Sequence, residues 1–374
     1  MKTGKTVTEL AIEIQRQAKA KRDFVADTAS LSFVADFEAP SIEGPQAPVP
    51  EVSLRLGNKA RIPLNDIAHD QIAEHVKIPR PYYDRMRREA PHLLADNVDH
   101  WFHKNPVKRL VRTLDGRGRA FLSDKFPTDL DNIDFAEAFL PVLAKRKLNV
   151  MSCDITEKKL YLKAVDEQLY RDVPVGYKMG DGSHKLFDTC APALILSNSE
   201  VGFGRLVVET GVYTGGCTNL ALFAKGGMKR THVGARHEIT EGVDVEVLSE
   251  KTKRKTFEAL LSQVADVIEA AFDEKVITRR LEAIEVAAGR KITAKVDDVL
   301  ELTAKNYGLN DGEKESVLKH LIEGASLSQY GLHAAITRSA QDNASYDRAT
   351  ELEYLGGRIL ELPKTDWARL AEAA

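Results

Sequence analysis

The chain has 374 residues, of which 43% are hydrophobic and 29% are charged, and its formal net charge is -3. This length and composition predict a globular protein of two or three structural units, and they exclude a fibrous chain. The slight negative charge also excludes a polycation. Any contact with nucleic acid therefore requires a local basic patch.

The cysteines and the N-terminal residues indicate in which cellular compartment the protein is expected. Cys153, Cys190 and Cys217 form no CxxC pair, which argues against a disulfide framework or a structural zinc module. The first residues carry charges throughout, and no window of the sequence approaches the length of a membrane span. We therefore expect a cytoplasmic protein with no membrane association.

The N-terminal third divides into three predicted segments. Residues 1–22 hold one amphipathic helix, and residues 23–52 are read as a linker because prolines and acidic residues replace any apolar periodicity. An α+β core domain is expected over residues 53–242. Its lead-in, residues 53–106, contains a small hairpin at Gly57-Asn58 and then several short helices with proline at their starts.

The stretch from Arg109 to Asn132 is the most informative part of the core. Asp115-Gly116 lies between two runs of strand-forming residues, and this is the strongest short-range signal for a β-hairpin. A two-residue turn with regular alternation places Arg112, Arg119 and Phe121 on one face. Two guanidinium groups beside an aromatic ring suit phosphate neutralisation and base stacking, although ordinary solvated strand charges explain the pattern about equally well.

A second basic cluster follows the last predicted strand, around Lys229 and Arg230. If it folds beside the hairpin face, the two clusters line one groove. The residues predicted to contact nucleic acid are Lys108, Arg112, Arg119, Phe121, Lys125, Lys229 and Arg230.

The rest of the chain completes the expected fold. Short connections between the strand-like runs after residue 148 favour antiparallel pairing, and a helix near residues 132–147 precedes them. Residues 243–374 show helical periodicity throughout and predict an α-helical C-terminal domain. The predicted class is α+β, with an antiparallel β-sheet core, a crossing helix and a helical C-terminal unit.

Five ordered motifs carry a family resemblance, and they read RTLDGRGRAFLSDKFPTDLDN, SNSEVGFG, GGCTNLALF, THVG and NASYDRATELEYLGGRIL. Together they resemble the phage/plasmid-like protein family, a domain of unknown function found in mobile elements, and more distantly the single-strand-annealing proteins of phage recombination. The motif positions carried over, without an assigned role, are Asp115, Gly116, Ser123, Asp124, Asn198, Ser199, Glu200, Gly202, Cys217, Asn219 and His232. The family often has Cys-x-Asn-Gly where this chain has leucine at position 220, which weakens a tight-turn role for that motif.

Reactive chemistry has less support in the sequence. Asn198, Ser199 and Glu200 form a turn-like cluster, although Glu200 also suits an acid, a base or a magnesium ligand. Cys217 and His232 invite a metal or a Cys-His nucleophile, but neither has a family-specific local signature. No phosphate-binding glycine loop is present, so we expect no cofactor and no bound metal.

These observations predict a mobile-element protein that binds single-stranded DNA without sequence preference, and that promotes annealing or recombination as a homo-oligomer. No catalytic residue is assigned. One alternative is a non-enzymatic structural or regulatory interaction protein of a phage or plasmid. The other is a metal-assisted enzyme that uses Glu200, Cys217 or His232.

Overall fold

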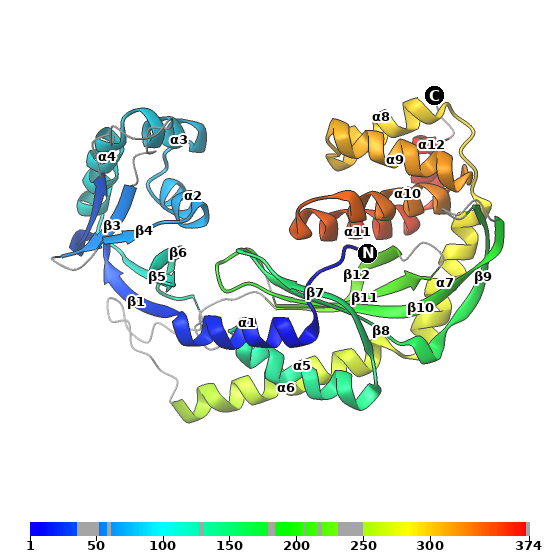
Figure 1. Ribbon diagram of the computed structural model, residues 1–374, viewed down its shortest axis with the longest axis horizontal. Coiled ribbons are helices and arrows are strands. Elements are labelled where there is room, and N and C mark those ends of the chain that lie inside the picture. The colour runs from blue at the N-terminus through cyan, green and yellow to red at the C-terminus, as the bar shows by residue number, and fades with distance from the viewer. Residues whose placement is uncertain are drawn as a thin grey trace, which may run out of the picture.

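The computed structural model describes residues 1–35, 52–57, 61–126, 131–178, 184–204, 206–215, 219–230 and 250–371. Figure 1 shows an open, U-shaped molecule in which an N-terminal lobe and a group of C-terminal helices rise on either side of a central sheet. The predicted α+β class, with antiparallel sheets and a helical C-terminal unit, is confirmed.

The central sheet of the described chain has six antiparallel strands in the order β12-β11-β10-β8-β7, with β9 also pairing with β10. Its strands are β7 (Asn149–Ile155), β8 (Leu160–Val165), β9 (Arg171–Lys178), β10 (His184–Asn198), β11 (Leu206–Thr214) and β12 (Asn219–Arg230). The long strand β10 pairs with β9 over its first half and with β8 over its second half. The predicted antiparallel pairing is therefore correct.

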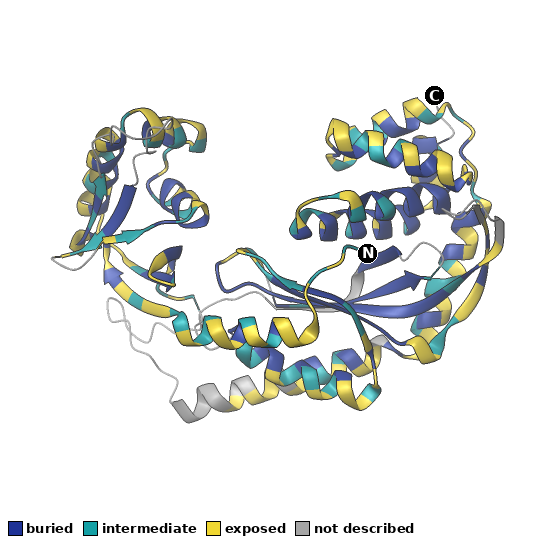
Figure 2. Cartoon of the chain, in the orientation of Figure 1, coloured by how far each residue is buried: buried dark blue, intermediate teal, exposed yellow. Residues whose placement is uncertain are grey.

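Helices cover both faces of this sheet, as Figure 2 shows by the burial of its strands. On one face lie α1 (Val7–Ala20), α5 (Asn132–Arg146) and α6 (Glu250–Ala271). Phe135 and Phe139 of α5 pack with Ile268 of α6 against alternate residues of β8 and β10, such as Leu162 and Leu194. Helix α5 is the predicted crossing helix.

The C-terminal helices lie on the other side of the sheet, where some pack on its strands and the others pack on those helices. They are α7 (Glu274–Gly289), α8 (Val296–Tyr307), α9 (Asp311–Gly324), α10 (Gln329–Asp342), α11 (Tyr346–Leu360) and α12 (Lys364–Ala371). Helix α11 lies directly on β12, and a Cβ added at Gly357 would stand 1.9 Å from the carbonyl oxygen of Leu222. Glycine at this position therefore permits the close approach of helix and strand.

The N-terminal lobe contains two small sheets and three helices. Its elements are β1 (Arg22–Asp27), the 3-10 turn η1 (Thr28–Ser30), β2 (Leu31–Ala35), β3 (Val52–Leu56), β4 (Arg61–Pro63), α2 (Asp66–His75), α3 (Arg80–Glu89), α4 (Pro91–Lys104), β5 (Lys108–Leu114) and β6 (Arg117–Ser123). The sheet orders are β1-β5-β6 and β2-β3-β4. The lobe has its own apolar core, which includes Phe33, Leu54, Tyr83 and Phe102.

The linker predicted over residues 23–52 is wrong in its first part, because that part forms β1 and β2. Strand β1 pairs with β5, more than eighty positions later in the chain, so its neighbours in the sequence carry no sign of its partner. Residues 36–51 lie outside the described residues. Strand β9 was also not predicted, because Pro174 and Gly176 interrupt its apolar pattern.

None of the helices within the described ranges is both long and apolar enough to cross a membrane.

Two buried histidines make the stability of this fold sensitive to acid. Burial lowers the pKa of His69 to about 3 and that of His333 to about 4. A histidine in the unfolded chain has a pKa near 6.5. As the pH falls below that value, the unfolded chain therefore binds protons at these two positions while the folded chain does not. Each histidine then lowers the free energy of unfolding by about 1.4 kcal/mol at pH 5.5.

Urea unfolding at several pH values between 7.5 and 4.5 measures this effect. The variant His69→Gln is expected to show a shallower fall of stability between pH 6.5 and 4.5 than the wild type, because one proton-binding site of the unfolded chain is gone. An unchanged slope would show that the imidazole of His69 titrates in the folded protein as it does in water.

Candidate functional site

A buried ion network joins the N-terminal lobe to the body of the molecule. Arg112 of β5 is 0% exposed. Its guanidinium donates to Asp23 Oδ2 at 2.8 Å, to Asp131 Oδ1 at 3.0 Å and to the backbone oxygen of Glu200 at 3.1 Å. Burial by itself lowers the pKa of Arg112, but Asp131 and Asp23 outweigh it and raise the pKa above its usual value. Arg112 is therefore a charged group whose two terminal nitrogens are paired, while its buried Nε has no hydrogen-bond partner among the described residues.

Glu200 is the second centre of this network. Its Oε1 accepts the backbone N–H of Asn132 at 2.8 Å, and its Oε2 lies 3.3 Å from a guanidinium nitrogen of Arg119. Lys21, at the end of α1, contacts both Asp131 and Glu200. The network then holds three cations and three carboxylates, namely Lys21, Arg112 and Arg119 with Asp23, Asp131 and Glu200. Such a balanced set satisfies buried charge without a ligand.

The hairpin that carries the two arginines was predicted correctly, but its faces were not. Asp115 and Gly116 both have positive φ, as a two-residue hairpin turn requires. However, the pairing shifts between Arg112 and Thr113, so that Arg112 lies opposite Ala120, Thr113 lies opposite Gly118, and Arg119 is left over as a β-bulge. A bulge changes which side chains share a face.

Phe121 consequently lies on the opposite face from Arg112. It pairs with Val111 in the core of the N-terminal lobe and is 3% exposed. Its ring stacks on Phe102 with centroids 5.5 Å apart and planes inclined by 8°. The predicted surface of Arg112, Arg119 and Phe121 is therefore wrong, because all three side chains are buried and Phe121 points away from both arginines.

The other predicted contact residues are scattered or undescribed. Lys108 and Lys125 are exposed, and both lie at the end of the hairpin remote from its turn. Lys229 and Arg230 close the edge strand β12, opposite Val207 and Leu206 of β11, and their side chains lie outside the described atoms. No continuous track formed by these residues is present in the described part of the chain.

The family motif around Asn198 holds structural roles. The side chain of Asn198 donates to Asn132 Oδ1 at 3.0 Å, and Ser199 Oγ donates to the backbone oxygen of Lys158 at 2.8 Å. Gly202 has a φ of +84°, which glycine adopts without strain. The turn interpretation thus agrees with these contacts, while Glu200 is committed to the ion network.

The remaining motif positions are structural where they are described. Both carboxylate oxygens of Asp115 accept hydrogen bonds from the guanidinium group of Arg16 in α1. Ser123 Oγ accepts a hydrogen bond from the backbone N–H of Lys125 at 3.2 Å. Asp124 lies in the turn after β6. Asn219 donates to the backbone oxygen of Ala334 at 3.1 Å. Cys217 and His232 lie outside the described residues.

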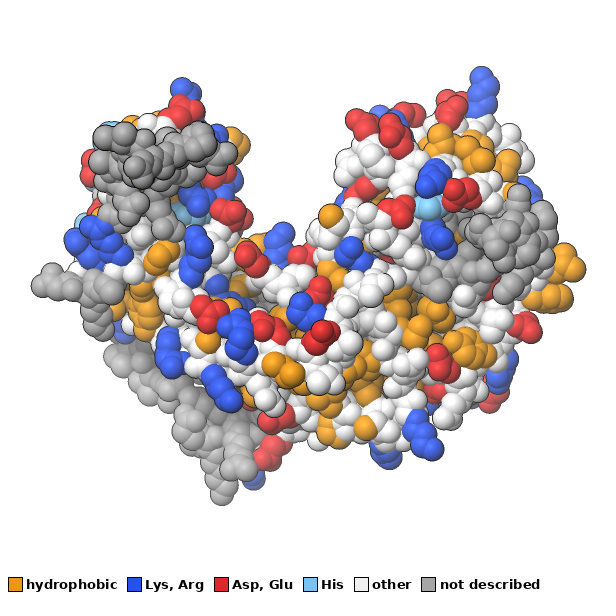
Figure 3. Space-filling view, viewed as in Figure 1, with side chains coloured by type: hydrophobic (Ala, Val, Ile, Leu, Met, Phe, Trp, Pro, Cys, Tyr) orange, Lys and Arg blue, Asp and Glu red, His pale blue; other side chains and the backbone are white. Residues whose placement is uncertain are grey.

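A polar pocket of about 220 Å³ lies at the foot of the N-terminal lobe. It is formed where α1, the start of α2, the tip of the β5–β6 hairpin and the β7–β8 turn meet, beside the hollow that Figure 3 shows between the two arms of the molecule. Its lining residues are Gln17, Asn65, Leu114, Arg117, Arg119, Ile155, Thr156 and Glu157. The lining thus includes two arginines and one glutamate.

The two arginines of this pocket differ in environment. Arg117 is exposed at the hairpin tip, whereas Arg119 is 8% exposed. Burial lowers the pKa of Arg119 despite the attraction of Glu200. An anion in the pocket would add a partner to this incompletely compensated cation. Sequence reasoning missed Arg117 as a site residue, although it belongs to the same basic stretch and begins β6 directly after the Asp115-Gly116 turn.

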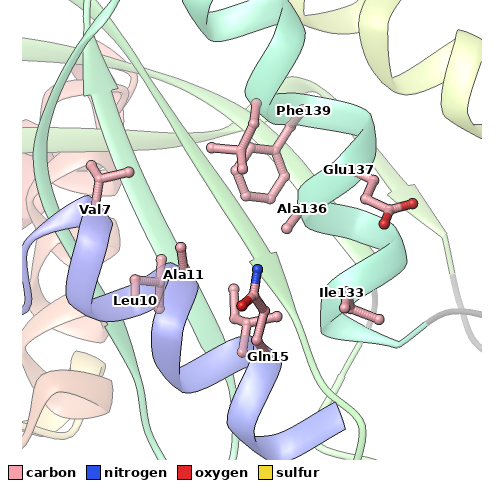
Figure 4. Close-up of a pocket in the computed structure, with 10 residues that line it drawn as sticks. Val7, Leu10, Ala11, Gln15, Ile133, Ala136, Glu137 and Phe139 are labelled. Carbon is pink, nitrogen blue, oxygen red and sulfur yellow. The ribbon is translucent and has the colours of Figure 1, made fainter. Parts of the chain in front are cut away.

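A second, apolar groove lies between α1 and α5 and has a volume of about 130 Å³. Figure 4 shows Val7, Leu10 and Ala11 of α1 facing Ile133 and Phe139 of α5 across it. Its chemistry is that of an aliphatic contact surface, and it offers no charged group other than the rim residue Glu137.

Within the described ranges, no group of three or more histidine, cysteine, aspartate and glutamate side chains is placed to hold a metal ion. The metal-assisted alternative invoked Glu200, Cys217 or His232. Of these only Glu200 is described, and its carboxylate is held by Arg119 and the backbone of Asn132.

Removing Arg112 tests the ion network. In Arg112→Ala, the buried carboxylate of Asp131 and the more exposed carboxylate of Asp23 lose their shared partner, so we expect the free energy of unfolding to fall by about 3 to 5 kcal/mol. Urea unfolding followed by circular dichroism measures this change. Lys108→Ala, on the exposed end of the same strand, is the matched control and is expected to stay within about 0.5 kcal/mol of the wild type. Equal stability of the two variants would contradict the network's role.

Comparison with protein-family models, curated proteins and solved structures finds no match for the chain. The resemblance to the phage/plasmid-like protein family therefore stays a prediction that rests on the five sequence motifs. The site itself is defined by geometry, and its main features are the buried ion network around Arg112 and the polar pocket beside Arg117 and Arg119.

Proposed function

We propose that the protein binds single-stranded DNA without sequence preference, and that a backbone phosphate occupies the polar pocket lined by Arg117 and Arg119. The observation that supports this is the pocket itself, whose lining includes two arginines, the amide residues Gln17 and Asn65, and Thr156. Planar guanidinium groups bind phosphate oxygens in pairs, and amides and hydroxyls add further hydrogen bonds.

The electrostatics favour a local contact over long-range attraction. The chain carries a net charge of -3, and Figure 3 shows acidic and basic side chains intermixed on the floor of the hollow. Binding of a polyanion then depends on the few cations at the pocket, and it weakens with added salt as counterions compete. Contacts to phosphate and sugar carry no sequence information, so this mode of binding is indifferent to base sequence.

Annealing or recombination would need more than one phosphate site along the strand. One pocket holds one phosphate group, and a longer track arises when several copies of the chain align their pockets, as in the predicted homo-oligomer. This assembly is part of the proposal, as are the mobile-element context and the cytoplasmic location.

A different observation favours the second candidate, a non-enzymatic interaction protein. The apolar groove between α1 and α5 is open at the surface, and a cavity of about 130 Å³ accepts one aliphatic or aromatic side chain of a partner. This candidate predicts no dependence on nucleic acid. A shift in size-exclusion volume upon addition of an oligonucleotide distinguishes the two.

Arg117 provides the direct test of the nucleic-acid proposal. Arg117→Ala is expected to weaken binding to an oligothymidylate and to lower the slope of log affinity against log salt by up to about 0.7, the value for one contact to a single strand. Salt-titrated fluorescence anisotropy measures both quantities.

Two comparisons make this result interpretable. Lys125→Ala removes an equally exposed cation at the far end of the hairpin and is expected to leave affinity and slope unchanged. Arg117 is exposed, so its loss should change the free energy of unfolding by no more than about 0.5 kcal/mol. If Arg117→Ala binds as the wild type does, the pocket is not the phosphate site.

A further inference from the structure

The loop between β10 and β11 presents an aromatic side chain on a rigid backbone. Ser199 Oγ accepts the backbone N–H of Phe203 at 3.0 Å while donating to the backbone oxygen of Lys158. Glycines stand on both sides of Phe203, and Gly202 and Gly204 have φ values of +84° and +131°. A Cβ at Gly202 would lie 2.8 Å from Leu122 Cδ2, so the loop packs tightly against the hairpin. The position of Phe203 is therefore fixed by its surroundings.

The ring of Phe203 is only partly covered. It packs against an apolar cluster at the base of the N-terminal lobe, which includes Ile67, Leu122 and Val201. The ammonium group of Lys158 lies 5.1 Å from the ring centroid, and Lys158 itself is exposed. The ammonium group of an exposed lysine thus lies over one face of the Phe203 ring, and the ring also packs against apolar residues of the protein.

This ring and the polar pocket belong to the same small region. Thr156 and Glu157 of the β7–β8 turn line the pocket, and Lys158 follows them directly. The backbone N–H of Lys158 donates to Thr156 Oγ1 at 3.1 Å, which ties the residue next to the ring to a wall of the pocket. One turn therefore separates a site for an anion from a supported aromatic face.

We infer that Phe203 is a stacking platform for one unpaired nucleobase of the strand whose phosphate lies in the pocket. In the free protein the ammonium group of Lys158 covers one face of the Phe203 ring. On binding, the base takes this place, and the ammonium group moves toward the neighbouring phosphate. Stacking on an aromatic ring accepts any base, because every base has a π-face. The inference rests on the proposed function and adds to it a requirement for unpaired bases.

This assignment also replaces the predicted role of Phe121. Phe121 is enclosed by Phe102 and His75 and has no face open to a ligand. Phe203 has intermediate exposure and the same pairing of an aromatic ring with a nearby cation that the sequence suggested for the hairpin. The bases of a duplex are already stacked on their neighbours and do not reach such a ring without unpairing.

The experiment compares two oligomers of equal length and charge on the full-length protein. One is an oligothymidylate, and the other carries abasic sites in place of its bases. Phe203→Leu keeps an apolar side chain in the cluster but removes the aromatic face. We expect this variant to bind the oligothymidylate about tenfold more weakly than the wild type, and the abasic oligomer equally well.

Phe126→Leu is the matched control, because Phe126 packs on the same apolar cluster and its ring centroid lies 5.8 Å from the guanidinium carbon of Arg112. It is expected to leave the binding of both oligomers unchanged. The inference is overturned if Phe203→Leu has no effect, or if it weakens binding to both oligomers equally. If Arg117→Ala weakens binding to both oligomers while Phe203→Leu weakens neither, the result supports the phosphate pocket and contradicts the stacking role of Phe203. If neither variant alters the binding of either oligomer, the proposed function falls as well.

Discussion

The buried side chain of Arg112 sets the relation between the two halves of this molecule. Asp23 belongs to the N-terminal lobe, whereas Asp131 and Glu200 belong to the body, and Arg112 contacts all three. A buried charged group is stable only with its partners in place. Displacing either half would therefore leave the buried guanidinium group of Arg112 without some of its partners. The ion network around Arg112 therefore links the two halves at the foot of the hollow between the arms.

The same chemistry explains why the sequence was ambiguous at this point. An arginine offers a planar fork of donors that suits carboxylates and phosphates equally well. The partners of Arg112 lie at positions 23, 131 and 200, far away along the chain, so the local pattern of the hairpin contains no sign of them. The bulge at Arg119 also depends on a distant partner, because it directs that side chain toward Glu200. Periodicity predicts a strand, but it does not predict where a ladder skips a residue.

Elements that depend on local signals were predicted well. The Asp115-Gly116 turn follows from backbone preference, and the C-terminal helices follow from apolar spacing within each helix. Strand β9 pairs with the next strand, β10, and was missed because Pro174 and Gly176 interrupt its apolar pattern. Elements that depend on distant pairing were also missed, as β1 was in the expected linker. The candidate site belongs to the second kind. Gln17, Asn65, Arg117 and Thr156 come from four separate elements, and only the folded chain brings them together.

Energetics divide the arginines of the hairpin by role. Breaking the buried set around Arg112 costs about 3 to 5 kcal/mol, whereas a charge-assisted hydrogen bond to a phosphate returns about 1.5 to 3 kcal/mol. A ligand therefore gains nothing by extracting Arg112 from its carboxylates. Arg117 is exposed, and Arg119 meets the pocket while keeping its contact with Glu200. The buried arginine fixes the architecture, and the arginines at the pocket are the ones that a phosphate reaches without dismantling it.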